Sequence, residues 1–91
     1  MPSPIHHDVA GLRFSTVLDG HEAELVYRLR GGALVIDHTG VPAAIGGRGV
    51  AGDLVKAALD YARAQGLRVV PACSYSAAYV QRHPEYADLV D

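Results

Sequence analysis

Residues 46–50 read Gly-Gly-Arg-Gly-Val and form the stretch of this sequence best suited to bind an anion. They lead into an amphipathic helix predicted over residues 51–65, and a helix opens with unpaired backbone N–H groups and about half a positive charge. Glycines let a ligand approach that backbone closely, Arg48 adds positive charge, and we expect no capping or acidic side chain to compete. The run therefore predicts a phosphate site, with an ordinary strand-to-helix turn as the alternative.

Cys73 is the single cysteine of the chain, so an internal disulfide is excluded. It ends a strand predicted over residues 67–73 and stands just before a helix start, where the dipole favours a thiolate over the reference pKa of about 8.5. A thiolate at this position could act as a nucleophile. The alternative is a buried cysteine that packs as a small apolar side chain.

Three further side chains could move protons near these residues. His38 follows Asp37 at the end of a strand and just before the glycine run, which suits a general base near neutral pH. It could instead hydrogen-bond the backbone and shape a bulge. Tyr75 and Tyr79 are four residues apart and share one helix face, so either phenol could act as an acid, with core packing as the alternative.

The composition describes one small globular domain of 91 residues, with 49% hydrophobic residues and a net charge of -2. Its basic residues are interleaved with acids, so no stripe of Lys and Arg is present to bind nucleic acid. The single cysteine fits a reducing compartment, and the first residues lack the pattern of a signal peptide. No stretch reaches the length of a membrane span, so we expect a cytoplasmic protein that does not bind membranes.

Apolar patterning predicts four strands and an α/β (α+β) fold class. Three strands should be antiparallel and separated by an Asp-Gly turn and a Gly-Gly turn, over residues 12–18, 22–30 and 33–36. The third strand is continuously apolar, as expected for a strand covered on both faces. These strands should therefore form the first part of a sheet.

The helix over residues 51–65 should end at Gly66 and cross over to the fourth strand. A strand, a helix and a strand in this order predict that the third and fourth strands are parallel. Pro71 cannot donate to a strand ladder, so the fourth strand should lie at an edge or diverge from its neighbour near Pro71. We expect a gap between the third and fourth strands as a result.

The two ends of the chain are predicted to be simple. Residues 1–10 should form a flexible arm, and its adjacent His6 and His7 have no ligand partners nearby, so we expect no metal site. Ser74 or Ser76 should cap a short helix that runs to Arg82, followed by a last helical turn.

This order of elements resembles that of the GCN5-related N-acetyltransferase family, and separated motifs narrow the resemblance to a short, single-domain subgroup. The motifs are His38-Thr39-x-Val41-Pro42, Gly47-Arg48-Gly49-Val50-Ala51, Pro71-x-Cys73-Ser74-Tyr75, and Tyr79 with Arg82-His83-Pro84-Glu85. The resemblance as a whole covers the chain from about Leu12 to its end. The resemblance implies a minimal acyl-CoA N-acyltransferase fold in one domain over residues 1–91.

The resemblance also implies acetyl-CoA as cofactor, with its pyrophosphate held by the N–H groups around Gly47, Gly49, Val50 and Ala51. Val41 would lie along the pantetheine arm and the acetyl carbonyl, between the third and fourth strands. Four residues complete the expected cofactor site: Gly46, Arg48, Ser74 and Tyr75. The family's usual Gln or Arg at the first signature position is Gly46 here, so one phosphate-orienting side chain is missing.

The implied activity is transfer of an acetyl group to an unidentified primary amine, on a small molecule or a protein. His38 could act as the base in direct transfer, Cys73 could accept the acetyl group or protonate the leaving thiolate, and Tyr79 could act as an acid. Larger family members place helices after the first strand to build an acceptor pocket, and this chain has a turn there. The alternative is therefore a non-catalytic CoA-binding or interaction module. For either function we expect a monomer or a homodimer.

Overall fold

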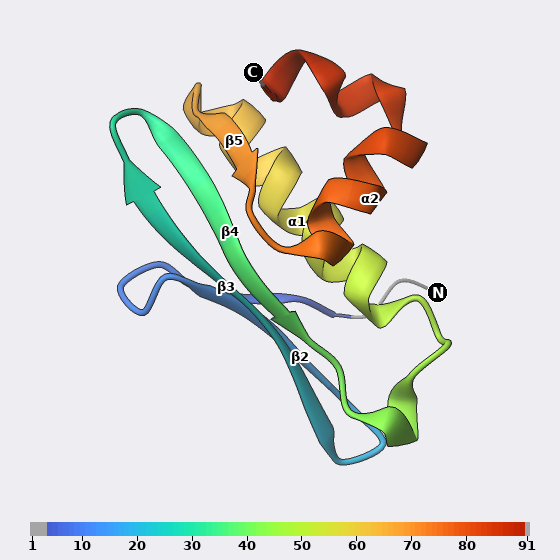
Figure 1. Cartoon of the computed structure of the whole chain (residues 1–91). Coiled ribbons are helices and arrows are strands. Elements are labelled where there is room, and N and C mark those ends of the chain that lie inside the picture. The colour runs from blue at the N-terminus through green and yellow to red at the C-terminus, as the bar shows by residue number, and fades with distance from the viewer. Residues whose placement is uncertain (1–3, 91) are drawn as a thin grey trace.

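A five-stranded sheet carries its helices on one face in this computed structural model, which describes residues 4–90 (Figure 1). The strands are β1 (His6–Asp8), β2 (Arg13–Leu18), β3 (His21–Arg30), β4 (Ala33–Gly40) and β5 (Arg68–Pro71). The helical elements are η1 (Ala43–Ile45), α1 (Val50–Gln65), α2 (Ser74–Arg82) and η2 (Pro84–Leu89). In the described residues, no helix is both long enough and apolar enough to cross a membrane.

The sheet order is β1-β2-β3-β4-β5, antiparallel throughout except for the parallel pair of β4 and β5. Both predicted hairpin turns form: Asp19 and Gly20 join β2 to β3, and Gly31 and Gly32 join β3 to β4. All four residues have positive φ angles, as two-residue hairpin turns require. The predicted mixed α/β fold, with its crossover helix between parallel strands, is confirmed.

The core lies between the sheet and α1. The apolar face of the predicted helix packs onto β3 and β4 with side chains that are fully buried: Leu54, Val55, Ala58, Leu59 and Ala62 against Leu25, Tyr27, Leu34 and Ile36. Gly66 ends α1 in the left-handed conformation, as predicted. This packing fixes where α1 begins, and the glycine run lies at that end.

The N-terminal segment differs from the predicted flexible arm, because His6–Asp8 forms strand β1 against β2. The His7 ring stacks on Phe14 at 3.9 Å between ring centroids, and its Nε2 lies 2.6 Å from the Tyr27 hydroxyl. Thr16 also donates a hydrogen bond to the carbonyl of Pro4. These contacts order the segment, and residues 1–3 of the predicted arm lie outside the described residues.

A β-bulge interrupts the ladder between β3 and β4 at Asp37. Tyr27 pairs with Ile36, but the preceding residue Val26 pairs with His38, so Asp37 is an extra residue in β4. Arg28 holds it with two hydrogen bonds of 2.6 and 2.9 Å to the Asp37 carboxylate. After the bulge the alternation of faces is reversed, because residues opposite one another in a ladder share a face.

The edge strand β5 leaves the sheet early, as Pro71 predicted. Its ladder with β4 ends at the pair Ile36 and Pro71, while β4 continues to Gly40. The N–H groups of Ala72 and Cys73 both donate to the Ile36 carbonyl at 3.1 Å, which turns the chain into α2. Figure 1 shows the resulting divergence of β4 and β5, the predicted gap between these strands.

Candidate functional site

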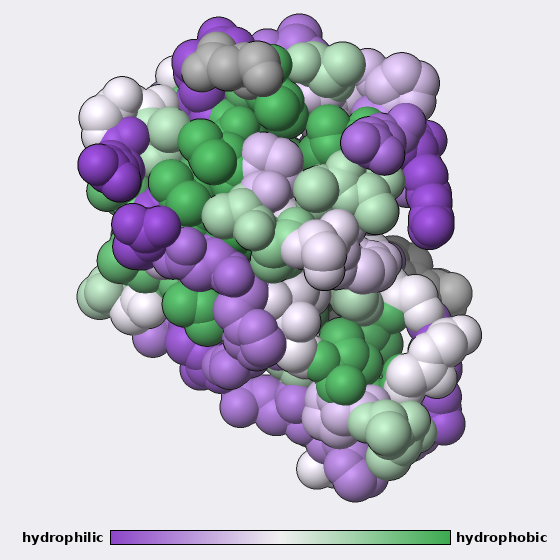
Figure 2. Space-filling view, in the orientation of Figure 1, coloured by the Kyte–Doolittle hydropathy of each residue, from purple (hydrophilic) through white to green (hydrophobic). Residues whose placement is uncertain are grey.

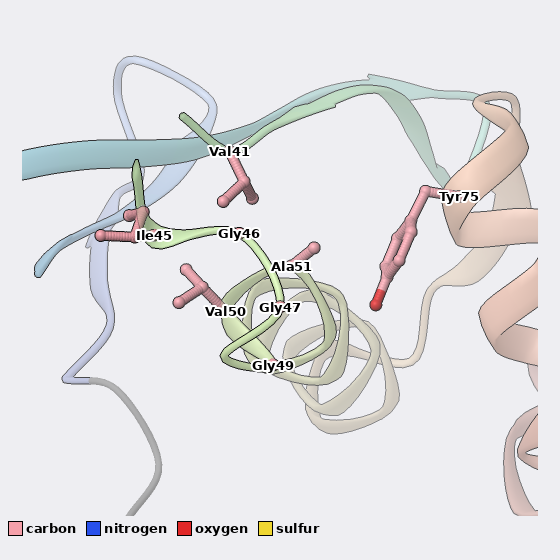
Figure 3. Close-up of a pocket in the computed structure, with 8 residues that line it drawn as sticks. All are labelled: Val41, Ile45, Gly46, Gly47, Gly49, Val50, Ala51 and Tyr75. Atoms are coloured by element: carbon pink, nitrogen blue, oxygen red, sulfur yellow. The ribbon is translucent and has the colours of Figure 1, made fainter. Parts of the chain in front are cut away.

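A partly open pocket of about 250 Å³ lies between the end of β4 and the start of α1. Eight residues line it, as Figure 3 shows: Val41, Ile45, Gly46, Gly47, Gly49, Val50, Ala51 and Tyr75. In the space-filling view, apolar residues reach the surface beside this end of α1 (Figure 2). Seven of the eight were predicted as cofactor-binding residues, and the structure brings them together around one hollow.

The backbone at the start of α1 has the form that the glycine run predicts. Gly47 and Gly49 adopt left-handed φ angles of 79° and 78°, and Gly49 occupies the N-cap position without a side-chain hydrogen bond. The first intrahelical bond runs from the Asp53 N–H to the Gly49 carbonyl. The N–H groups of the residues before Asp53 therefore have no intrahelical acceptor and lie at the positive end of the helix dipole.

The charges around this helix start differ in part from the prediction. Asp53 lies in the first turn of α1, so the expectation that no acidic side chain would offset the dipole is wrong. Arg48 is outside the pocket lining and pairs with Asp19 on the hairpin between β2 and β3. Both partners are about half exposed, and such surface pairs contribute at most about 1 kcal/mol, so an incoming phosphate can replace the carboxylate at low cost.

Two tyrosines of α2, Tyr75 and Tyr79, share one helix face as predicted, and this face packs over the first turn of α1. A Cβ atom on Gly52 would lie 3.3 Å from the Tyr75 hydroxyl and 3.4 Å from the Tyr79 ring, so Gly52 makes room for both. The Tyr75 hydroxyl points toward the start of α1 (Figure 3). Tyr79 does not line the pocket; it stacks on His83 at 3.9 Å, and burial raises the pKa of its phenol.

Cys73 lies where β5 turns into α2 and takes the N-cap position that Ser74 or Ser76 was expected to occupy. Its Sγ accepts a hydrogen bond from the Ser76 N–H at 3.4 Å, so the prediction of a serine cap is wrong. The Thr39 hydroxyl reaches the same sulfur from β4 at 3.6 Å. Ser74 is exposed and does not line the pocket.

The surroundings of Cys73 favour its thiolate. Burial would raise the pKa of the Cys73 thiol, but hydrogen bonds from the Ser76 hydroxyl, the Ser76 N–H and the Thr39 hydroxyl outweigh it and lower that pKa. The direction agrees with the prediction, although local hydrogen bonds supply much of the effect. Cys73 does not line the pocket; Val41, which does, follows its contact residue Thr39 by two positions in the chain.

His38 is not brought to this site. Because of the bulge at Asp37, His38 pairs with Val26 while Thr39 pairs with the buried Leu25, so Thr39 faces α1 and His38 faces the opposite side. His38 is exposed there, with its Nε2 atom close to Gly40. In the described residues, no three His, Cys, Asp or Glu side chains gather closely enough to hold a metal ion.

Sequence reasoning missed three residues of this region. Ile45 lines the pocket and is fully buried, and its position in a short apolar run after Pro42 was the available signal. Ser76 was considered as a cap, but its spacing of three from Cys73 also allows a reciprocal contact with that residue. Thr39 stood in a motif without a role, since its contact with Cys73 depends on the bulge.

Known proteins share this sequence and this fold. A family model described as GCN5-related N-acetyl-transferase matches residues 13–89. Protein NATD1 of Mus musculus is 40% identical over 86 residues, which cover 91% of this chain and 78% of the relative. Protein NATD1 of Danio rerio is 34% identical over 91 residues, which cover 94% of this chain and 83% of the relative.

A solved structure shows the same architecture. The NMR solution structure of a GCN5-like protein from Staphylococcus aureus matches with a TM-score of 0.77 and 29% sequence identity, over 99% of this chain and 89% of that one. The family model and the relatives each span most of the chain, and the fold agrees with them. This chain therefore belongs to the GCN5-related N-acetyltransferase family.

Proposed function

We propose that this protein binds acetyl-CoA at the start of α1 and transfers its acetyl group to a primary amine. The observation that carries the proposal is the pocket at the glycine run, whose lining residue Val41 follows Thr39, the contact of Cys73, by two positions in the chain. One region of the protein thus offers an anion site and a thiol. Membership of the acetyltransferase family makes acetyl-CoA the ligand to test first.

The groups at the pocket suit a pyrophosphate and an attached apolar arm. The backbone N–H groups after Gly49 can donate to phosphate oxygens, and the open space beside Gly47 and Gly49 lets a ligand come close to the backbone. Val41 and Ile45 offer an apolar wall on the β4 side. When bound, acetyl-CoA would supply a thioester whose acetyl group can be transferred.

The geometry favours Cys73 over His38 as the residue that handles the acetyl group. Cys73 lies on the α1 side of the sheet, where Thr39 and Ser76 contact its sulfur, whereas His38 lies on the opposite face. A covalent acetyl-Cys73 route therefore suits this structure better than direct transfer with His38 as base. The acceptor would be the amine of a small molecule or of a protein.

A second candidate is a CoA-binding module without catalysis. Two observations favour it: Gly46 stands where the family usually has Gln or Arg, and β2 joins β3 through a tight turn at Asp19 that leaves no acceptor helices. This reading predicts binding of CoA without transfer to any amine. Saturable binding together with amine turnover above a heat-inactivated control would exclude it.

The test is incubation with acetyl-CoA followed by intact-mass analysis and an acceptor screen. We expect a mass increase of one acetyl group that is absent in Cys73→Ala and retained in the neighbouring control Ser74→Ala. Adding a polyamine or a lysine peptide that serves as acceptor should then remove the acetyl group from the protein. Turnover and protein acetylation that both persist without the Cys73 thiol would contradict the covalent route.

A further inference from the structure

A buried hydroxyl lies against the Cys73 thiol. Ser76 is fully buried, and its Oγ atom lies 3.0 Å from the Cys73 sulfur and also donates to the Cys73 carbonyl at 3.0 Å. A hydroxyl has one hydrogen, so it can donate to only one of these two acceptors at a time. While the carbonyl accepts the Ser76 hydrogen, the hydrogen of the Cys73 thiol is free to donate to the Ser76 oxygen.

Loss of the thiol proton changes this arrangement. The sulfur then accepts hydrogen bonds and cannot donate them, so the Ser76 hydroxyl has a charged acceptor in place of a neutral carbonyl. Hydrogen bonds to ionised groups are about twice as strong as bonds between neutral groups. Rotation about one bond of Ser76 therefore supplies a donor to the sulfur when the charge forms.

Two other donors approach the same atom. The Ser76 N–H points at the Cys73 sulfur from the first turn of α2, at 3.4 Å, and the Thr39 hydroxyl approaches from β4 at 3.6 Å. Thr39 faces the sulfur because the bulge at Asp37 reversed the alternation of β4. Donors from a strand and from a helix thus meet at one sulfur.

We propose that Ser76 and Thr39 are positioning residues that hold the Cys73 sulfur as an anion, Ser76 by turning its hydroxyl from the Cys73 carbonyl to the sulfur. Their part in acyl transfer rests on the proposed function. In that step the anion forms a bond to the acyl carbon of a thioester while the bond to the leaving sulfur breaks, so one thiolate replaces another. The proton that Cys73 released to solvent can then neutralise the leaving thiolate.

The test measures the rate of Cys73 alkylation by iodoacetamide as a function of pH, without acetyl-CoA. The variants are Ser76→Ala and Thr39→Val. The matched controls are Ser74→Ala, at an exposed position two residues before Ser76, and Thr39→Ser, which keeps a hydroxyl. We expect the pH midpoint to rise by about one unit in Ser76→Ala and by about half a unit in Thr39→Val, because each loses a hydrogen bond to the charged form. Both controls should keep the midpoint of the unmodified protein.

A midpoint that stays unchanged in both variants would overturn the positioning roles, whether or not acetyl groups reach Cys73. Thr39 and Ser76 lie on different elements, so a folding defect in one variant, checked by circular dichroism, leaves the other to decide. Intact-mass analysis with acetyl-CoA separates the two proposals. Raised midpoints without acetylation of the unmodified protein would support the positioning roles and count against the proposed function alone.

Discussion

At the scale of single residues, the contact between Thr39 and Cys73 depends on one extra residue in β4. Without Asp37 as a bulge, strict alternation would turn His38 toward α1 and Thr39 away from it. Asp37 holds this conformation through Arg28, whose hydrogen bonds lower the pKa of the Asp37 carboxyl. A pair on the outer face of the sheet thus decides which side chain reaches the thiol.

The sequence indicated the residue types of the site better than their roles. The position of Cys73 before a helix could be predicted from strand and helix patterns. The direction in which the surroundings shift the pKa of the Cys73 thiol, downward, could also be predicted. The reversal at Asp37 could not be predicted, because the continuously apolar run before it has no alternation from which a face can be assigned. The sequence therefore predicted that His38 would lie at the site, whereas Thr39 is the residue of β4 that faces α1 there.

This placement predicts opposite outcomes for two substitutions. His38→Ala should keep acetyl transfer within about threefold of the unmodified protein, since an exposed side chain on the far face contributes no proton transfer to the site. Cys73→Ala should lower transfer by about a hundredfold or more, because it removes the nucleophile. Steady-state rates at saturating acetyl-CoA measure both. A large loss in His38→Ala with an unchanged Cys73→Ala would reverse the assignment.

His7 predicts a stability that falls in acid. Burial lowers the pKa of His7, and the charge of His6 lowers it further. Together these effects outweigh Asp8, which raises the pKa. The rings of Tyr27 and Tyr61 also contact the His7 ring. The folded protein thus binds this proton more weakly than the unfolded chain. Stability from neutral His7 should be complete above about pH 6.5 and be lost as the pH falls through the lower folded pKa.

Urea unfolding midpoints between pH 8 and pH 5 measure this effect in comparison with His7→Phe, which keeps a ring to stack on Phe14 but does not titrate. The variant should lose less stability over this pH range than the unmodified protein. His21→Ala, which removes an exposed histidine at the start of β3, serves as the control and should behave like the unmodified protein. Equal acid losses in all three proteins would contradict the prediction.

At the scale of elements, two docking events set the geometry of the site. The apolar face of α1 positions the glycine run, and α2 and η2 pack onto the other side of α1 (Figure 1). The Tyr86 hydroxyl of η2 donates to the Asp60 carboxylate of α1 at 2.8 Å, while Arg63 pairs with Asp88. The element order was predictable from periodicity, but these contacts between elements distant in sequence were not.

The bond between Tyr86 and Asp60 predicts a loss of stability in base. Burial and the Asp60 carboxylate raise the pKa of Tyr86 to about 12. The unfolded chain releases this proton near pH 10, so the stability from the phenol is complete below about pH 10 and is lost as the pH rises toward 12. Tyr86→Phe should cost about 2 kcal/mol of unfolding free energy at pH 8, since it removes a hydrogen bond to a charged group.

Urea unfolding at pH 8, 10 and 11 measures the difference in unfolding free energy between the unmodified protein and Tyr86→Phe. This difference should shrink as the pH rises above 10. Tyr75→Phe is the matched control, because Tyr75 is more than a third exposed and lies on the pocket side of α2. A difference that stays constant with pH would show that the phenol does not titrate as described.

At the scale of the whole molecule, the sheet separates between β4 and β5. Pro71 ends the ladder of β5 while β4 continues, and the chain between them supplies α1 with its glycine start. This plan could be predicted because turns, an uncapped helix and a proline in a strand are local signals. The docking of β1 could not, because it depends on the His7 ring meeting Phe14 and Tyr27 from other strands.

The most direct test of the central claim is calorimetric titration of acetyl-CoA into the unmodified protein, Gly49→Glu and the control Gly32→Glu. Gly49 and Gly32 share left-handed φ angles of 78° and 81° with open space around them, but Gly32 lies at the opposite end of β4. Both variants thus suffer similar backbone strain. We expect saturable binding in the unmodified protein and in Gly32→Glu, and loss of binding in Gly49→Glu. No binding to the unmodified protein, or equal binding by both variants, would contradict a cofactor site at the start of α1.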